Sequence, residues 1–191
     1  MNFSSNFKIS CSKKSLISIF GQKYLTKSNS FIIPNAIDTS RFSRVQDNKK
    51  LINRINIVHV GRYCENKNQM LLIEPLPYIL RDFPNAKLQL VGFNEEYKKQ
   101  LQNKAILLCV ESKVKFLPSD SDIREVLAKA NLFILPSVTE GFGIALLEAQ
   151  AMEVPCLVSD SVPQEVNCGL CKFLSLSEKR EVWALEAINI N

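Results

Sequence analysis

Asn131-Leu-Phe-Ile-Leu135 is a continuous apolar run, and Pro136-Ser-Val-Thr-Glu-Gly-Phe-Gly143 follows it directly. The next eight residues, Ile144-Ala-Leu-Leu-Glu-Ala-Gln-Ala151, favour a helix. An apolar run without alternation predicts a strand that is buried on both faces of its sheet. The stretch therefore predicts a buried strand, a glycine-containing loop and a helix, which together form the basic unit of an α/β fold.

The same alternation of strand and helix continues on both sides of this unit. Pro75 and Pro77 predict that one of the helices starts late, kinks or breaks. Strands joined through helices form right-handed crossovers in a mainly parallel sheet. We therefore predict the α/β class, with a Rossmann-like parallel sheet, helices on both faces and ligands beyond the carboxyl ends of the strands. The further predicted strands are 55–60, 86–91, 113–116 and 155–158, and the further helices are 68–82, 95–109 and 122–129.

The first part of the chain has a different pattern. A helix is predicted over 12–27 and a short strand over 31–33, and the polar segment 39–53 is typical of a connector. We therefore divide the chain into residues 1–53 and a main domain over residues 54–191.

Composition limits the class of protein. The 191 residues are 46% hydrophobic and 23% charged, as in a globular domain with a substantial core. No apolar stretch approaches the roughly 18–20 residues of a membrane span, and the N-terminus lacks the apolar core of a signal peptide. These features favour a cytoplasmic location.

The net charge of +5 is compatible with three interpretations. The chain binds anionic ligands such as phosphates, it contacts an acidic membrane face, or it has an ordinary solvated surface. Nucleic acid is not expected as a partner, because the basic residues are scattered without interleaved aromatic residues.

The six cysteines do not predict a metal or redox centre. Cys168 and Cys171 form a single C-x-x-C pair, and the only histidine, His59, lies far away in the sequence. A zinc site needs about four ligands, and a redox pair is expected at a helix start after a strand. Free thiols and no metal are therefore the expectation.

Arg62 and Lys67 follow the strand predicted over 55–60. Arginine binds phosphate oxygens through two parallel hydrogen bonds, and lysine adds a compact positive charge. Two cations at the carboxyl end of a parallel sheet therefore suit a diphosphate. Taken alone, such a pair is more often part of the solvated surface.

Glu140 and Glu148 enclose the loop of Gly141 and Gly143 and the start of the following helix. Glycines at a helix start let a ligand approach the backbone, and the free N–H groups there favour anions. Eight residues at ~100° each return a side chain to within ~80° of its first direction, so both carboxylates can border one pocket. Carboxylates accept hydrogen bonds from vicinal hydroxyls, which suits a sugar nucleotide. In the alternative, Glu148 is exposed helix surface, and Glu140 is an acid near the helix N-terminus, where the helix dipole makes it worth ~0.3–1 kcal/mol of stability.

This combination resembles the donor signature of the group 1 glycosyltransferases, in which two glutamates separated by seven residues enclose such a loop. The resemblance covers about residues 10–185. It implies a retaining enzyme of the GT-B architecture, in which two Rossmann-like domains face a cleft, and it assigns this chain to the C-terminal donor-binding half. The residue sequences of these motifs are similar to those of the family's bacterial members in capsular and exopolysaccharide synthesis. The matching segments are Ser137–Asp160, Pro163–Glu165, His59–Arg62 with Lys67, Pro84–Gly92 and Ile33–Asp38.

The resemblance also implies a role for each site residue. Glu140, Arg62 and Lys67 form the implied catalytic set, because the two cations stabilise charge on the leaving nucleotide and replace a metal ion. The implied donor contacts are Arg62 and Lys67 to the diphosphate, Glu140 to the sugar, the backbone of Gly141, Phe142, Gly143 and Ile144 to sugar and phosphates, Glu148 to the ribose, and Leu117 and Pro118 beside the base.

The implied reaction moves a sugar from a nucleotide-diphosphate sugar to a saccharide or lipid-linked acceptor, with retention, in cell-surface polysaccharide synthesis. No cofactor is expected. The enzyme is expected in the cytoplasm, with association at the inner face of the membrane. Residues 1–53 match the end of an N-terminal acceptor domain and the interdomain connector.

Two alternatives follow from departures from the family pattern. Since most of an acceptor domain is not represented, the chain can instead be a non-catalytic remnant, or a subunit that needs a separate acceptor-domain chain. Ala36, Pro118 and Glu153 also stand where the family tends to have glycine, and a left-handed backbone at Glu153 would cost roughly 1 kcal/mol. A dinucleotide-dependent oxidoreductase would need G-x-G-x-x-G after the first strand, which Val60-Gly-Arg-Tyr-Cys-Glu65 does not provide.

Overall fold

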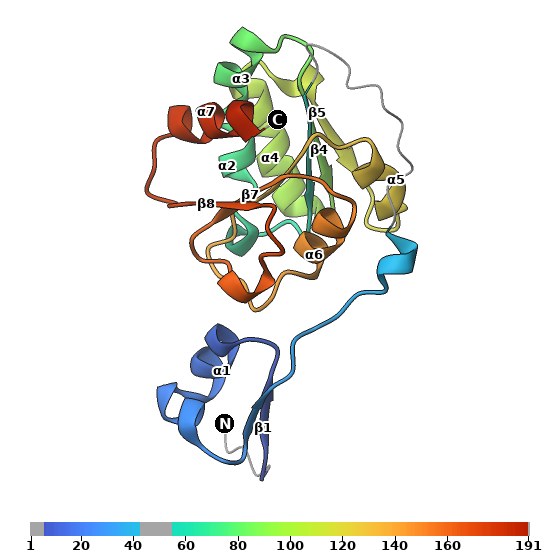
Figure 1. Ribbon diagram of the computed structural model, residues 1–191. Helices are drawn as coiled ribbons and strands as arrows, with labels where there is room; N and C mark the ends of the chain where they lie inside the picture. The colour runs from blue at the N-terminus through green and yellow to red at the C-terminus, as the bar shows by residue number, and fades with distance from the viewer. Residues whose placement is uncertain (1–5, 43–54, 191) are drawn as a thin grey trace.

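The computed structural model describes residues 6–42 and 55–190, in which a small N-terminal unit lies beside a larger α/β domain (Figure 1). All neighbouring strands of the larger domain's six-stranded sheet are parallel. The order reverses between β3 and β6, which is the switch point at which such sheets bind ligands. The strand order is β5 (Val114–Leu117), β4 (Lys87–Val91), β3 (Asn56–Val60), β6 (Leu132–Leu135), β7 (Cys156–Ser159) and β8 (Cys171–Leu174).

The helices confirm the predicted break at the prolines. The chain ends one short helix before Pro75 and begins another directly after it. The strand β8 and the last helix were not predicted. The helices of this domain are α2 (Met70–Ile73), α3 (Leu76–Asp82), α4 (Glu95–Leu107), α5 (Ile123–Ala128), α6 (Ile144–Ala151) and α7 (Arg180–Ile190), with short 3-10 turns η3 (Glu65–Lys67), η4 (Glu111–Lys113) and η5 (Gln164–Val166).

Two apolar clusters cover the two faces of the sheet. Ile57 and Leu88 point to one face, where they pack with Trp183 of α7 and with residues of α2, α3 and α4. Val58 and Phe133 point to the other, where they pack with Leu146 of α6 and with α5. Successive strand residues thus enter opposite clusters, as expected of buried parallel strands. The rigid sheet that results fixes the loops at its carboxyl edge.

The N-terminal unit consists of β1 (Lys8–Ser10), α1 (Lys13–Phe20), the 3-10 turn η1 (Gln22–Thr26) and β2 (Ser30–Ile32). The predicted helix over 12–27 is divided at Gly21, whose φ is 94°. After β2, the chain leads through η2 (Thr39–Arg41) towards α5 of the larger domain (Figure 1). The predicted boundary between residues 53 and 54 lies outside the described residues.

Ser12 joins the two units. Its hydroxyl accepts a hydrogen bond from the Ser15 N–H and so caps α1, and it donates to the Gly141 carbonyl at 2.5 Å. Lys14 also donates to the Ser161 carbonyl. The N-terminal unit is thus hydrogen-bonded to the glycine-containing loop of the larger domain.

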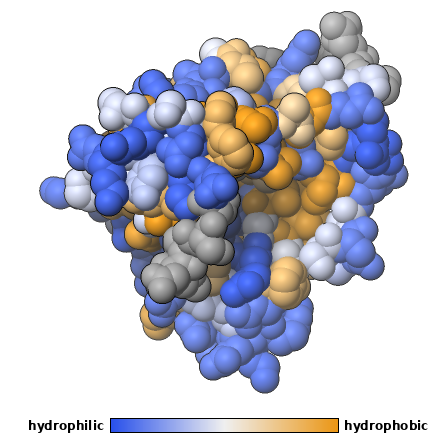
Figure 2. Space-filling view, turned by 90° about the horizontal axis from the view of Figure 1, so that it is seen from below, coloured by the Kyte–Doolittle hydropathy of each residue, from blue (hydrophilic) through white to orange (hydrophobic). Residues whose placement is uncertain are grey.

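An apolar surface is left open on the N-terminal unit. Phe7, Ile9, Phe31 and Ile33 are 58%, 56%, 45% and 60% exposed. Ile9 and Phe31 are opposite each other in the parallel pair of β1 and β2, and the rings of Phe7 and Phe31 lie 5.9 Å apart. Figure 2 shows the molecule from below, the end at which the N-terminal unit lies, with apolar areas open to solvent. We call these four side chains the apolar face.

Glu153 has a left-handed backbone, with φ of 56°, two residues after the end of α6. A side chain is strained there, so Glu153→Gly should raise the free energy of unfolding by about 0.5–1 kcal/mol, net of the greater freedom of glycine in the unfolded chain. Urea unfolding measures this. Glu178→Gly, at a position without positive φ, should lower stability instead. An equal loss in both variants would contradict the account.

Candidate functional site

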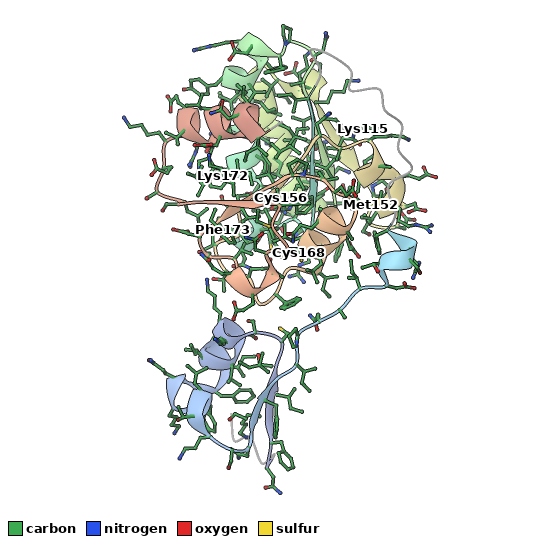
Figure 3. All side chains as sticks on the ribbon, in the orientation of Figure 1. Lys115, Met152, Cys156, Cys168, Lys172 and Phe173 are labelled. Carbon is green, nitrogen blue, oxygen red and sulfur yellow. The ribbon has the colours of Figure 1, made fainter. Side chains whose placement is uncertain are left out.

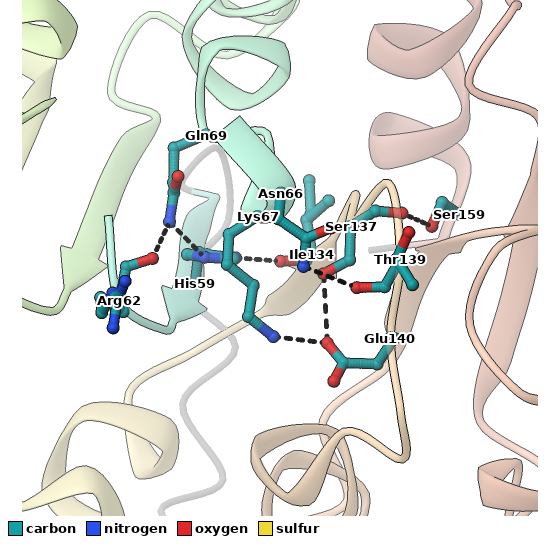
Figure 4. A network of polar contacts seen from close by, with 10 residues as sticks. All are labelled: His59, Arg62, Asn66, Lys67, Gln69, Ile134, Ser137, Thr139, Glu140 and Ser159. Atoms are coloured by element: carbon teal, nitrogen blue, oxygen red, sulfur yellow. Dashed lines mark hydrogen bonds and ion pairs between the residues drawn. The ribbon is translucent and has the colours of Figure 1, made fainter. Parts of the chain in front are cut away.

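The predicted site residues Lys67 and Glu140 meet at the switch point of the sheet. The Lys67 ammonium lies 2.5 Å from the Glu140 carboxylate, which also accepts a hydrogen bond from the Ser137 hydroxyl at 3.2 Å (Figure 4). The side chains are only 23% and 11% exposed. A partly buried ion pair therefore connects the loop after β3 with the loop after β6, across 73 residues of sequence.

Further hydrogen bonds hold the loop after β6 in place. The Asn66 side-chain amide donates to the Thr139 carbonyl at 2.8 Å, and the Val138 N–H donates to the Asn66 carbonyl at 2.8 Å. From the other side, the Ser159 hydroxyl of β7 donates to the Ser137 carbonyl at 2.6 Å. Glu140 is therefore positioned by both neighbouring strands. Sequence reasoning missed Asn66 and Ser159, because only strand order brings them to this loop.

His59 supports the other side of the site from within the core. Its Nδ1–H donates to the Ile134 carbonyl at 2.9 Å, and its Nε2 faces the Gln69 amide nitrogen at 3.2 Å. The same Gln69 nitrogen donates to the Arg62 carbonyl at 3.0 Å. Since that nitrogen is a donor, Nε2 must accept, and the imidazole is neutral. His59 is thus a positioning residue for the backbone that carries Arg62.

Burial lowers the pKa of His59 to about 4, against the opposing effect of the Ile134 carbonyl, and Lys67 lowers it further. At pH values below the ordinary histidine pKa of 6.5, the unfolded chain therefore binds more protons at His59 than the folded chain does. Stability from this group is fully present above pH 6.5 and is lost as the pH falls towards about 4. As the pH falls from about 7 to 5, we expect this group to lower the free energy of unfolding by about 2 kcal/mol, measured by urea unfolding.

The chain has one histidine, so His59→Gln should flatten this pH dependence. A histidine ring proton that titrates near pH 6.5 in the folded protein would contradict the account.

Arg62 and the start of α6 provide groups that are free for an anion. The Arg62 side chain is exposed, and no hydrogen bond or ion pair joins its guanidinium to another described residue. Helix α6 has no side-chain cap, and its N-cap Gly143 has φ of 92°. The Phe142 side chain is only 5% exposed and packs in the core, so only its backbone can meet a ligand. Ile144 is 47% exposed at the helix start.

Glu148 lies on α6, about one turn after Ile144, at the edge of a hollow that Glu140 does not line. It borders a cleft of about 560 Å³ between the segment 37–42 and residues 120–124. Burial raises the pKa of Glu148, and no hydrogen bond or ion pair joins its carboxylate to another described residue. A half-buried, unpaired carboxylate is ready to accept hydrogen bonds from a ligand.

Comparison with known proteins identifies the family. The family model for glycosyl transferases group 1 matches residues 41–168, well over half of the chain. The chain belongs to the group 1 glycosyltransferases.

One sequence relative and two solved structures show how much of the chain is matched. This chain is 31% identical over 179 residues to the putative glycosyltransferase EpsF of Bacillus subtilis, covering 87% of this chain and 46% of EpsF. The Anabaena Alr3699/HepE structure in complex with UDP and glucose has a TM-score of 0.78 at 21% identity, over 97% of this chain and 53% of that one. The C-terminal domain of the Francisella tularensis group 1 protein LpcC has a TM-score of 0.68 at 19% identity, over 81% and 87%.

This chain therefore spans about half the length of its curated relative EpsF. The likeness to the two solved structures shows the fold, a Rossmann-like half of the GT-B type. The family assignment and fold class predicted from the sequence are confirmed.

The predicted base contacts Leu117 and Pro118 lie beside the cleft and do not line it. The Leu117 carbonyl accepts a hydrogen bond from the Gly92 N–H at 3.2 Å, and the Tyr63 hydroxyl oxygen lies 3.4 Å from the same carbonyl oxygen. The Pro118 carbonyl accepts from the Ser121 N–H and hydroxyl. The cleft wall begins two residues later, at Asp120. Sequence reasoning missed Asp120, because nothing in the chain shows how the turn after Pro118 directs the side chains that follow.

The cysteines are free thiols in the part of the chain that the structure describes. Cys156 on β7 is opposite Cys171 on β8, and Cys168 precedes β8 (Figure 3). The Cys156 thiol lowers the pKa of Cys171 through a hydrogen bond. Within residues 6–42 and 55–190, no three His, Cys, Asp or Glu side chains form a group that could hold a metal.

Proposed function

We propose that this chain binds a nucleotide-diphosphate sugar and serves as the donor half of an enzyme that transfers the sugar. The contact between Lys67 and Glu140 is the observation that carries the proposal. It brings the two sequence motifs together at the switch point, next to the uncapped start of α6. Sheets of this kind bind nucleotides at that place.

The two ends of the site suit the two ends of the donor. The Arg62 guanidinium and the N–H groups at the start of α6 bind the diphosphate, and Lys67 shares its charge between phosphate and Glu140. Glu140 accepts hydrogen bonds from the sugar hydroxyls, and Glu148 accepts them from the ribose. As the bond to the sugar breaks, negative charge grows on the leaving diphosphate, where the two cations stabilise it.

The finer parts of the proposal follow the family resemblance. Transfer proceeds with retention and without a metal, to a saccharide or lipid-linked acceptor in cell-surface polysaccharide synthesis. The enzyme works in the cytoplasm, at the inner face of the membrane. In the described part of the chain, no helix has the length and apolar character that crossing a bilayer requires.

A second candidate function is that of a donor subunit that transfers sugar only together with another α/β half, on the same or another polypeptide. The apolar face of Phe7, Ile9, Phe31 and Ile33 favours it, because parallel sheets are normally covered on both faces and two strands rarely persist alone.

A transfer assay with this chain alone separates the two candidates. The second predicts that nucleoside diphosphate binding is retained while transfer from UDP- or GDP-sugars to saccharide acceptors is absent. Full transfer by this chain alone would exclude the second candidate. Absence of both binding and transfer would exclude the first.

A further inference from the structure

The cleft beside Glu148 is chemically different from the phosphate end of the site. One part of its lining is apolar and includes Ile37, Phe42 and Ile123. The charged part has four carboxylates and two arginines, a net charge of −2. Such a surface repels phosphate, and it suits a flat, uncharged group that donates hydrogen bonds. On the proposed function, on which this inference rests, that group is the nucleoside end of the donor.

Two of the carboxylates in the cleft are already engaged. Asp122 accepts the Arg124 N–H at 2.9 Å and pairs with the Arg124 guanidinium at 2.6 Å. Asp38 accepts the Ser40 N–H and hydroxyl. By contrast, no hydrogen bond or ion pair joins the carboxylates of Asp120 and Glu148 to other described residues. With Glu148 assigned to the ribose, Asp120 is the acceptor that remains for the base.

The hydrogen-bonding pattern of the bases then decides which one fits. An ionised carboxylate only accepts hydrogen bonds, and its two oxygens suit two adjacent donors. Guanine presents two adjacent donors, N1–H and the N2 amino group. Uracil presents one N–H between two carbonyl oxygens, which a carboxylate repels. Adenine and cytosine each place an amino group beside an acceptor nitrogen.

We propose that this cleft binds the nucleoside of the donor and that Asp120 selects guanine, so that the donor is a GDP-sugar. Phe42 and Ile123 provide apolar contacts for the base. The HepE complex contains UDP, but at 21% identity that structure shows the fold and does not determine the base bound here.

Calorimetric titration of the whole chain with GDP and UDP tests the proposal. The wild type should bind GDP about 10–100-fold more tightly than UDP, the range of one good paired contact. In Asp120→Asn the side chain gains a donor beside its acceptor, a pattern that matches uracil. The ratio of the two affinities should therefore fall about tenfold or more, or reverse. Glu178→Gln removes a carboxylate after β8, at the opposite edge of the sheet from β5, and should leave the ratio unchanged.

Two outcomes would overturn the inference alone. One is that wild-type protein binds UDP as tightly as GDP. The other is that Asp120→Asn weakens both ligands by the same factor, as a loop-stabilising role would. If the chain bound neither nucleotide, the proposed function would fall together with the inference. Circular dichroism and urea unfolding of each variant confirm that the comparison is made on folded protein.

Discussion

Gly92→Ala is expected to destabilise the protein by about 3 kcal/mol, the upper part of the usual range for overpacking. A Cβ atom at this position would lie 2.2 Å from the Gly61 carbonyl oxygen and 2.8 Å from Cε1 of Tyr63. The first is backbone, and the second belongs to a fully buried ring whose hydroxyl donates to the Leu90 carbonyl at 2.8 Å. Neither can move without displacing the loop that carries Arg62.

Urea unfolding measures this loss. Gly141→Ala is the matched control, because its Cβ would meet only the Ser15 hydroxyl, at 4.0 Å, and Gly141 has no positive φ. We expect its stability to change by less than about 1 kcal/mol. A Gly92→Ala protein as stable as the control would contradict the close approach of the loops after β3 and β4.

Removing the two cations should give the largest effects on donor binding. Hydrogen bonds to charged groups contribute about 1.5–3 kcal/mol each, so Arg62→Ala and Lys67→Ala should each weaken nucleoside diphosphate binding by roughly 10–100-fold. The two variants should differ in stability. The Arg62 guanidinium has no partner among the described residues, so its loss should leave unfolding unchanged. Lys67→Ala leaves the Glu140 carboxylate, 11% exposed, without its cation and should destabilise the fold.

Calorimetry and urea unfolding of both variants test this pair of results. Lys99→Ala, which removes an exposed lysine from α4, is the control for a general change in charge. The assignment would be contradicted if Lys99→Ala weakened binding as much as Arg62→Ala. It would also be contradicted if Arg62→Ala lost binding only in proportion to a loss of stability.

The regular part of the fold could be predicted from the sequence because its signals are local. The buried strand β6, the glycine at the start of α6 and the break at Pro75 all follow from short stretches. The strands β1 and β8 were missed. Each is short and lacks the continuous apolar run that marks β6, because a lysine lies within both β1 and β8.

The site was predictable in its residue types but not in its connections. The meeting of Lys67 and Glu140 depends on the strand order, and the support from His59 through Gln69 depends on a buried contact between neighbouring elements. The residue type of His59 did not predict this supporting role, since a histidine in an apolar strand is usually part of the core. Asp120 was missed for a similar reason, because it borders the cleft only once the segment 37–42 is in place.

The central claim is that the edge of the sheet at β3 and β6 is a nucleotide-sugar site. The most direct measurement is a calorimetric titration of the purified chain with UDP and GDP, repeated with Arg62→Ala. We expect saturable binding of at least one nucleotide with one site per chain, weakened roughly 10–100-fold in Arg62→Ala. No binding of either nucleotide by folded protein, or equal binding by wild type and Arg62→Ala, would contradict it.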